Sequence, residues 1–338
     1  MNRWLIAAPL SVALGYVFTV WQVPAAWILG GIAGAGAVAL ISGRDLPMNR
    51  YVFDFARGAI GVFAAVPLLG VPPRDFLPFL VPGLVTAAAV LALAYAGGLI
   101  LANHGVSRET GVLSLLPGGA SVMPAIAADV GADMRYVALS QYVRLLIVSV
   151  TLPLVAALFD APASTAHATT DGPWWMWLLV PALIAAGNPA GTLLRLPNPS
   201  VFGPMLATVL VGSLLDAPVV PPTVLTTAAF LAIGWMCGGA LSVPALKQFS
   251  RMLPATLAYI AALMAACAAM GWVVAKWLGI TFLEGYLATS PGAIETVLAL
   301  AAEGGAGPAV IALQLIRLIC VLIFASYLPK ILKRRGEG

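Results

Sequence analysis

The chain has 338 residues, of which 61% are hydrophobic and only 9% are charged, and its mean hydropathy is +1.00. This composition excludes an ordinary soluble domain and is typical of an all-α polytopic membrane protein. The net charge of +4 does not indicate a nucleic-acid surface, because the basic residues stand in short loops and near the C-terminal end, where they act as topology signals.

Two series of apolar segments fill the chain, one on each side of a polar stretch. The first series lies at about 4–20, 24–41, 51–70, 76–102, 110–131 and 134–158, and the second at about 174–187, 198–215, 222–243, 253–276, 282–303 and 308–329. The apolar start could be mistaken for a signal peptide, but a similar pattern opens the second series, so we interpret it as a retained membrane helix. The predicted domains are a first repeat at 1–159, a polar linker at 160–173 and a second repeat at 174–338.

The two halves match each other at a nearly constant spacing. The matched pairs, in chain order, are Leu29-Gly30-Gly31 with Phe202-Gly203-Pro204, Ile60-Gly61 with Ile233-Gly234, Val81-Pro82 with Leu253-Pro254, Gly111 with Gly285, Pro117-Gly118 with Pro291-Gly292, and Gln141-x-x-Arg144 with Gln314-x-x-Arg317. So many pairs in the same order indicate an internal duplication.

The segments 110–131 and 282–303 are each interrupted by a Pro-Gly pair, and the topology depends on whether they span the membrane or turn back. If both turn back, each half crosses five times, the halves are inverted, and only Arg74 and Lys276 lie in outer loops. If both span, the loop with Lys247 and Arg251 faces outward, against the positive-inside rule. We therefore predict two inverted five-helix repeats, about 10 membrane helices and two re-entrant hairpins, with both termini cytoplasmic.

The two breaks are the candidate transport site. Proline removes a backbone donor and glycine permits turns, so the helix should unwind at both points. Unwound backbone at membrane depth survives only inside protein or beside a water-filled cavity, and matched breaks in two halves are the best pointer to a transport site. The candidate substrate-binding residues are Pro117, Gly118, Gly119, Ser121, Gln141, Arg144, Ser290, Pro291, Gly292, Gln314 and Arg317.

Arg144 and Arg317 each lie well inside an apolar segment, where an arginine costs at least about 2.5 kcal/mol. Their guanidinium groups suit an anionic substrate, because the planar fork matches a carboxylate. A structural role is the alternative. Each arginine would then hold backbone carbonyls of its hairpin, or pair with one of the carboxylates Glu295, Asp129 and Asp133.

The two breaks are not identical, because Ser121 in the first half corresponds to Glu295 in the second. Glu295 and Asp129 are therefore the candidates for coupling transport to H+ or Na+. Asp54 and Arg57 stand three residues apart, and we interpret them as an internal salt bridge.

No cofactor, metal or catalytic site is predicted. Cys237, Cys267 and Cys320 lie far apart, and His104 and His167 are both in loops, so no ligand cluster forms. The chain also lacks the GxxxxGK[ST] motif that binds ATP. We do not expect an enzyme.

The runs 116–121 and 131–133, followed by Gln141-x-x-Arg144 and the weaker second copy, resemble the AbrB-duplication family of bacterial inner-membrane proteins. Some of its members are labelled as ammonia monooxygenases and others as regulators. An oxygenase needs several histidine or carboxylate ligands that face each other, which this chain lacks. The predicted architecture also resembles that of the 2-hydroxycarboxylate and glutamate–sodium carriers, which implies a homodimer with a moving transport domain. Those carriers have more glycine at the hairpin tip.

We therefore predict a secondary transporter in the bacterial inner membrane that moves a small organic anion, a carboxylate, by alternating access coupled to H+ or Na+. Its partners would be membrane lipid, the anion and the coupling ion, and no nucleic acid. Two alternatives stay open at this point. One is a non-transporting membrane sensor that affects gene expression indirectly, and the other is a channel.

Overall fold

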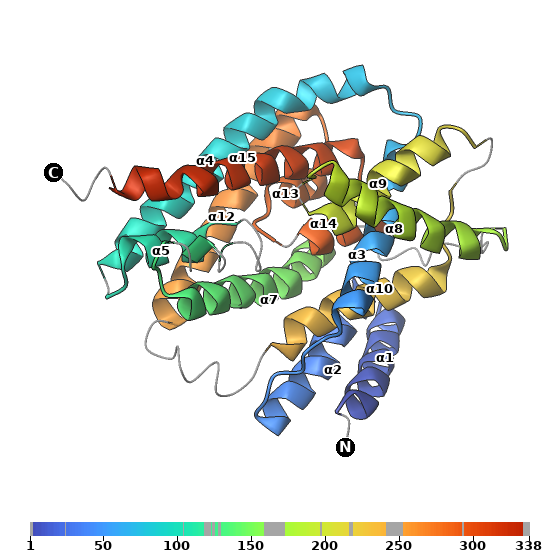
Figure 1. Ribbon diagram of the computed structural model, residues 1–338, viewed down its shortest axis with the longest axis horizontal. Coiled ribbons are helices and arrows are strands. Elements are labelled where there is room, and N and C mark those ends of the chain that lie inside the picture. Colours follow the sequence, from blue (N-terminus) through green and yellow to red (C-terminus); the bar gives the residue numbers. More distant parts are fainter. Residues whose placement is uncertain are drawn as a thin grey trace. The chain divides into compact units, whose positions relative to one another are not determined.

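A computed structural model describes residues 3–23, 25–103, 105–117, 123, 126–127, 130–158, 173–196, 198–215, 219–240, 253–292 and 294–333. These residues form thirteen α-helices and two short 3-10 helices and contain no strand, which confirms the predicted all-α class (Figure 1). Several residues singled out by sequence lie outside the described part of the chain, namely Gly118, Gly119, Ser121, Asp129, His104, His167 and almost all of the linker.

The helices follow the apolar segments closely. The first half holds α1 (Trp4–Val20), α2 (Ala26–Ser42), α3 (Arg50–Ala65), η1 (Val66–Leu68), η2 (Pro73–Phe76), α4 (Leu77–Ala102), α5 (Arg108–Leu115) and α7 (Met134–Leu158). The second half holds α8 (Met176–Leu193), α9 (Pro199–Gly212), α10 (Thr223–Gly239), α12 (Leu253–Leu278), α13 (Phe282–Thr289), α14 (Ile294–Glu303) and α15 (Pro308–Lys333).

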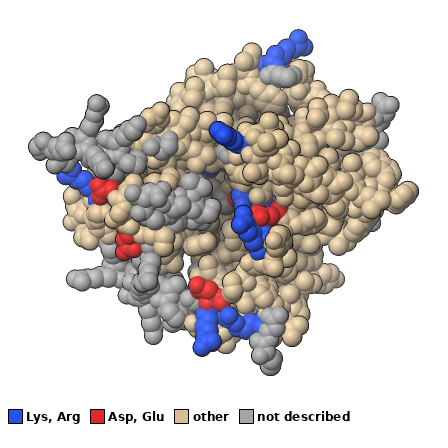
Figure 2. All heavy atoms as spheres, viewed as in Figure 1, with Lys and Arg blue, Asp and Glu red and all other residues tan. Residues whose placement is uncertain are grey.

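Length and hydropathy make this a multi-pass membrane protein. Six described segments are long and apolar enough to cross a bilayer, and four more apolar helices are 10–17 residues long. On the face shown in Figure 2, blue and red atoms are sparse among tan ones, as the low content of charged residues requires. The helices α5 and α13 have only 8 residues each, which rise about 12 Å and cannot cross a hydrocarbon core of about 30 Å.

The helices pack into two compact units, and each unit takes elements from both halves of the sequence. Unit 1 comprises Met1–Asp75, Ser149–Pro244 and Ile294–Ile311, and unit 2 comprises Phe76–Val148, Ala245–Ala293 and Ala312–Gly338. The chain passes from unit 2 to unit 1 between α13 and α14, at the second predicted break. The units of packing are therefore not the two predicted repeats.

In unit 1, corresponding helices of the two halves make corresponding contacts. Helix α1 packs on α2 as α8 packs on α9, and α10 packs on α2 as α3 packs on α9. A methyl group added to Gly61 would collide with the Val201 carbonyl oxygen, and one added to Gly234 would collide with the Ile28 carbonyl oxygen. Glycine permits both close approaches, since any side chain there would push the helices apart.

The chain also enters α2 and α9 in the same unusual backbone conformation. Ala25 before α2 and Asn198 before α9 both have a φ of 52°, and Gln22 and Arg195, three residues earlier, have φ values of 56° and 53°. Residues other than glycine rarely adopt positive φ, although asparagine tolerates it better than most. This shared conformation sets where the Asn198 side chain starts, which matters below.

Unit 2 repeats its contacts in the same manner. Helix α4 packs on α5 and α12 on α13, and α4 also packs on α12. Gly111 of α5 meets the Gly98 carbonyl of α4, and Gly285 of α13 meets the Gly271 carbonyl of α12. Each short helix is thus pressed against a long apolar helix, which fixes the position of the break that follows it.

Candidate functional site

The first break begins where α5 ends. Leu116 has an extended backbone, with φ −64° and ψ 124°, and Pro117 after it is buried. In a continuous helix the Leu113 carbonyl would accept a bond from the N–H of residue 117, but proline has none. The break therefore leaves buried carbonyl oxygens in need of donors.

Gln141 and Arg144 of α7 supply those donors. The Gln141 side-chain amide donates to the carbonyl oxygens of Leu113 at 2.8 Å and Leu116 at 3.0 Å. Arg144 donates to the Leu116 carbonyl at 2.9 Å and to the Gln141 amide oxygen at 2.7 Å. The pair lies three residues apart on one helix face, so both side chains reach the same break.

At the second break, side chains of α15 likewise donate to the backbone carbonyls. Pro291 removes the donor for the Leu287 carbonyl, and the Gln314 amide donates to that carbonyl at 2.6 Å. Arg317 donates to the Ser290 carbonyl, as Arg144 does to Leu116. Ser290, Pro291 and Gly292 are all buried. The alternative that each arginine holds backbone carbonyls of its break is thus observed for Arg144 and Arg317, and the two glutamines share this role.

Carbonyl bonds do not neutralise the two arginines. Arg144 and Arg317 are only 2% and 5% exposed, and neither pairs with any carboxylate whose side chain the structure describes. Their Nε atoms are buried and have no hydrogen-bond partner among the described residues. Both belong to unit 2. Unit 2 therefore holds two buried positive charges with donors to spare.

Two of the carboxylates considered as partners for these arginines have other contacts. Asp133 accepts a bond from the Tyr136 backbone N–H at 3.0 Å, at the start of α7. Glu295 belongs to unit 1, where its partner is Arg57 at 3.0 Å. The described ion pair of Glu295 is thus with Arg57 and not with the arginine of either Gln-x-x-Arg pair.

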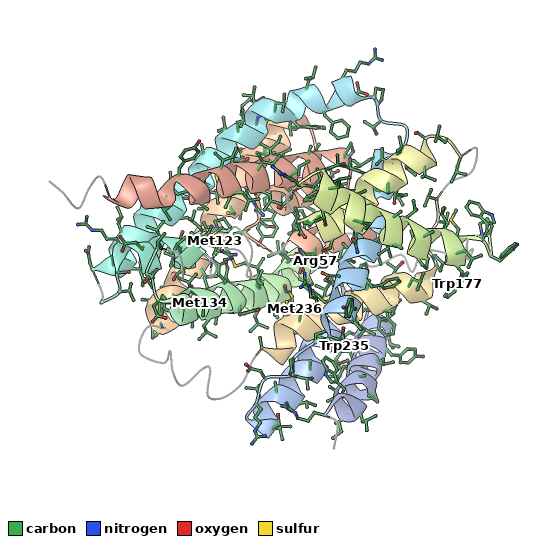
Figure 3. All side chains as sticks on the ribbon, viewed as in Figure 1. Arg57, Met123, Met134, Trp177, Trp235 and Met236 are labelled. Atoms are coloured by element: carbon green, nitrogen blue, oxygen red, sulfur yellow. The ribbon has the colours of Figure 1, made fainter. Side chains whose placement is uncertain are left out.

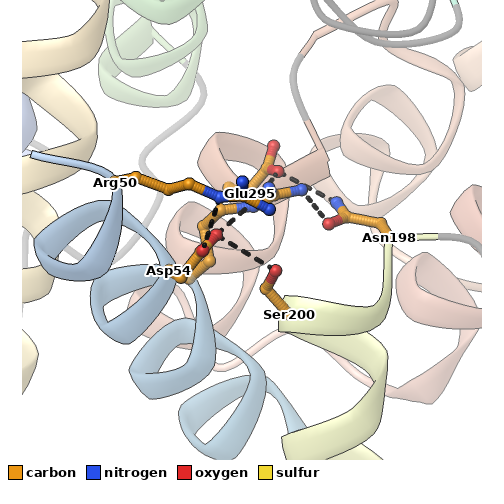
Figure 4. Close-up of polar contacts among 6 residues, drawn as sticks. Arg50, Asp54, Asn198, Ser200 and Glu295 are labelled. Carbon is orange, nitrogen blue, oxygen red and sulfur yellow. Dashed lines mark hydrogen bonds and ion pairs between the residues drawn. The ribbon is translucent and has the colours of Figure 1, made fainter. Parts of the chain in front are cut away.

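Glu295 lies in a cluster of polar side chains in unit 1, which we call the Arg57 cluster (Figure 4). Arg57 of α3 stands beside α14 (Figure 3), and its Nε forms the ion pair with Glu295. The Asn198 amide donates to the same Glu295 oxygen at 2.9 Å and accepts a hydrogen bond from Arg57. The Arg57 guanidinium also lies over the Phe53 ring, 5.2 Å from its centroid.

The outer part of the Arg57 cluster is looser. Asp54 lies 4.0 Å from Arg57 and 3.5 Å from the exposed Arg50, and it accepts a hydrogen bond from Ser200 at 3.2 Å. The predicted Asp54–Arg57 pair is confirmed, but it is the longer of the two described ion pairs of Arg57. Sequence reasoning missed Asn198 and Ser200, although a polar Asn-Pro-Ser run at the start of an apolar helix was a usable signal.

Comparison with known proteins gives a family and two relatives. A family model described as "Transition state regulatory protein AbrB" matches residues 27–333. The "Putative regulator AbrB" of Escherichia coli (strain K12) is 33% identical over 97% of this chain and 98% of its own length. The "Uncharacterized protein YhjN" of Bacillus subtilis (strain 168) is 25% identical over 95% of this chain and 90% of its own.

Proposed function

This chain belongs to the AbrB family, and we propose that it is a secondary transporter of a small organic anion, a carboxylate. The observation that carries the proposal is the pair of buried guanidinium groups of Arg144 and Arg317, which have no counter-ion among the described residues, in the unit that carries both Pro-Gly breaks. A buried cation without a counter-ion is costly, and an anion from solution removes that cost.

The free donors favour a carboxylate. Each arginine donates to a carbonyl with one terminal nitrogen, and its buried Nε has no partner among the described residues, so an oxygen of a bound anion would complete its hydrogen bonding. The donors are fixed by the break rather than by the ligand, because Gln141 and Gln314 hold the same segments of backbone. A site that is already organised before binding spends little free energy on ordering side chains.

The composition of each unit supports transport by movement of one unit against the other. Each unit draws on both halves, and corresponding helices make corresponding contacts, as a duplicated carrier would require. The short helices α5 and α13 cannot span a membrane, which suits arms of re-entrant hairpins in two inverted repeats. Cysteine labelling at Ala132 should succeed only from the cytoplasmic side, and labelling from outside alone would contradict the first hairpin.

The rest of the proposal concerns setting and energy source. The carrier would lie in the bacterial inner membrane as a homodimer with both termini in the cytoplasm, and a gradient of H+ or Na+ would drive it. Two relatives from bacteria are consistent with that setting. The second candidate function is a membrane sensor, favoured by the word "regulator" in the name of the Escherichia coli relative.

Uptake into proteoliposomes separates the two functions. Purified protein would be tested with a panel of labelled mono- and dicarboxylates, amino acids and ammonium. The carrier predicts saturable, gradient-dependent uptake of a carboxylate that survives in R144K/R317K, which keeps both charges, and is lost in R144Q/R317Q, which keeps an amide donor at each place. Thermal unfolding of both variants controls for damage to the breaks. No uptake of any compound by the wild-type protein would favour the sensor.

A further inference from the structure

We propose that Glu295 is the proton-binding residue of this protein, and that protonation of Glu295 breaks its ion pair with Arg57. The role of this proton in transport rests on the proposed function, since the proton gradient would supply the energy. It rests on unit 1 alone for its geometry. The Arg57 cluster lies at the first turn of α14, immediately after the point where the chain leaves unit 2.

The helix pair of the first half that corresponds to α3 and α9 carries no such charges. At the spacing that matches Ile60-Gly61 to Ile233-Gly234, Arg57 corresponds to Phe230 and Asp54 to Thr227. Asn198 corresponds to Ala25, which has the same left-handed backbone, and Glu295 corresponds to Ser121. Phe230 is buried and packs edge-on against Phe63. Helix α10 thus packs on α2, as α3 packs on α9, with an apolar residue at the place of Arg57, so the contact between these helices does not require that charge.

The geometry gives Arg57 two carboxylate partners, so one of them remains when the other is protonated. Its Nε lies 3.0 Å from Glu295, whereas its Nη1 lies 4.0 Å from Asp54 on its own helix. When a proton from water binds a Glu295 carboxylate oxygen, the side chain becomes a neutral acid and its attraction for Arg57 is lost. Asp54 then remains as the counter-ion of Arg57. The strongest polar link between α3 and α14 is broken, while the charge on α3 stays paired.

A proton fits this cluster better than a metal cation does. Hard cations take several oxygen ligands in one shell, and a carboxylate already bound to a guanidinium cannot provide them without bringing two cations together. A proton needs one carboxylate oxygen. The Glu295 side chain is 10% exposed and that of Arg57 is 19% exposed, so the pair is largely sheltered and still reachable.

Few other ionisable side chains lie beside Glu295 among the described residues. Helix α3 presents Arg57 and Asp54 to this cluster, and Arg50 reaches Asp54 from its exposed end. Helix α10, which also packs on α14, contributes the buried thiol of Cys237. Helix α9 presents only the uncharged Asn198 and Ser200. Glu295 is thus the carboxylate whose protonation changes the contact between α3 and α14.

Infrared difference spectroscopy tests proton binding without requiring transport. The full-length protein in lipid would be titrated between acidic and neutral pH, and the carbonyl stretch of protonated carboxyl groups would be recorded. We expect a band that disappears in E295Q and persists in D75N, which removes an exposed carboxylate outside the cluster. A wild-type spectrum with no band that E295Q removes would overturn the inference, because Glu295 would then stay ionised.

Flux measurements test the use of the proton. Under an imposed pH gradient, E295Q should lose accumulation of the anion and keep exchange of labelled for unlabelled anion, because the anion site itself is unchanged. Accumulation by E295Q at the wild-type level would refute coupling through this residue. If the wild-type protein carries no anion at all, the proposed function fails, whereas the infrared band still decides whether Glu295 binds a proton.

Discussion

The two compact units differ in how they hold arginine side chains, two of which are buried in unit 2 and one of which is partly buried in unit 1. In unit 2, Arg144 and Arg317 bond to carbonyls of the breaks and have no described counter-ion, whereas in unit 1 Arg57 is paired with Glu295 and Asp54. Hydrogen bonds to carbonyls hold the backbone in place but do not neutralise the arginine charge. An ion pair with a carboxylate neutralises the charge, and protonation of the carboxylate breaks that pair. The difference suits one unit to an anion and the other to a proton.

The largest expected loss of stability comes from removing one partner of the Arg57–Glu295 ion pair. Arg57→Leu leaves the Glu295 carboxylate buried without its counter-ion, which costs about 3–5 kcal/mol for fully buried pairs and less here, because part of the Arg57 side chain is exposed. R57L/E295L should recover most of the lost stability, since Phe230 shows that the equivalent place accepts an apolar residue. Chemical denaturation in detergent measures both. A double variant as unstable as the single one would show that the fold needs the charges.

A smaller loss of stability is expected when the glutamine at either break is replaced, and the loss should be similar at the two breaks. Gln141→Leu or Gln314→Leu leaves the Leu113 or Leu287 carbonyl buried without a donor, at a cost of about 1–3 kcal/mol each. Glutamate is the matched control that keeps the shape and removes the donating amide. Equal losses of thermal stability would support equivalent breaks, and a large loss at only one would break the equivalence.

The smallest effect is expected at Arg50. Its side chain is 88% exposed and its contact with Asp54 is 3.5 Å long, so Arg50→Leu should change the free energy of unfolding by less than about 1 kcal/mol. This variant is the control for Arg57→Leu, as it removes an arginine from the same helix. A loss comparable to that of Arg57→Leu would mean that the outer part of the Arg57 cluster carries the stability.

The helices were largely predictable, because apolar periods and Pro-Gly breaks are local properties of the sequence. The segment predicted as broken at 282–303 contains α13 and α14 with the break between them. The Gln-x-x-Arg pairs were also found, since matched motifs inside apolar segments are visible without a structure.

The partners of the charges could not be predicted in the same way. Asp54 lies three residues from Arg57 and drew attention as a local pair, whereas Asn198 and Glu295 reach it only through the packing of α9 and α14. The division into two units was equally hidden, because it follows contacts between distant segments rather than the order of the halves. Sequence spacing shows which residues repeat, and only packing shows which residues meet.

Equilibrium binding of the transported carboxylate to purified protein tests the central claim most directly. Labelled anion would be titrated against the wild-type protein, R144K/R317K and R144Q/R317Q, with thermal unfolding recorded for each. We predict saturable binding to the wild-type protein, weakened binding when lysine replaces both arginines, and none in the folded glutamine variant. Unchanged affinity in R144Q/R317Q would contradict the assignment of Arg144 and Arg317 as the anion site.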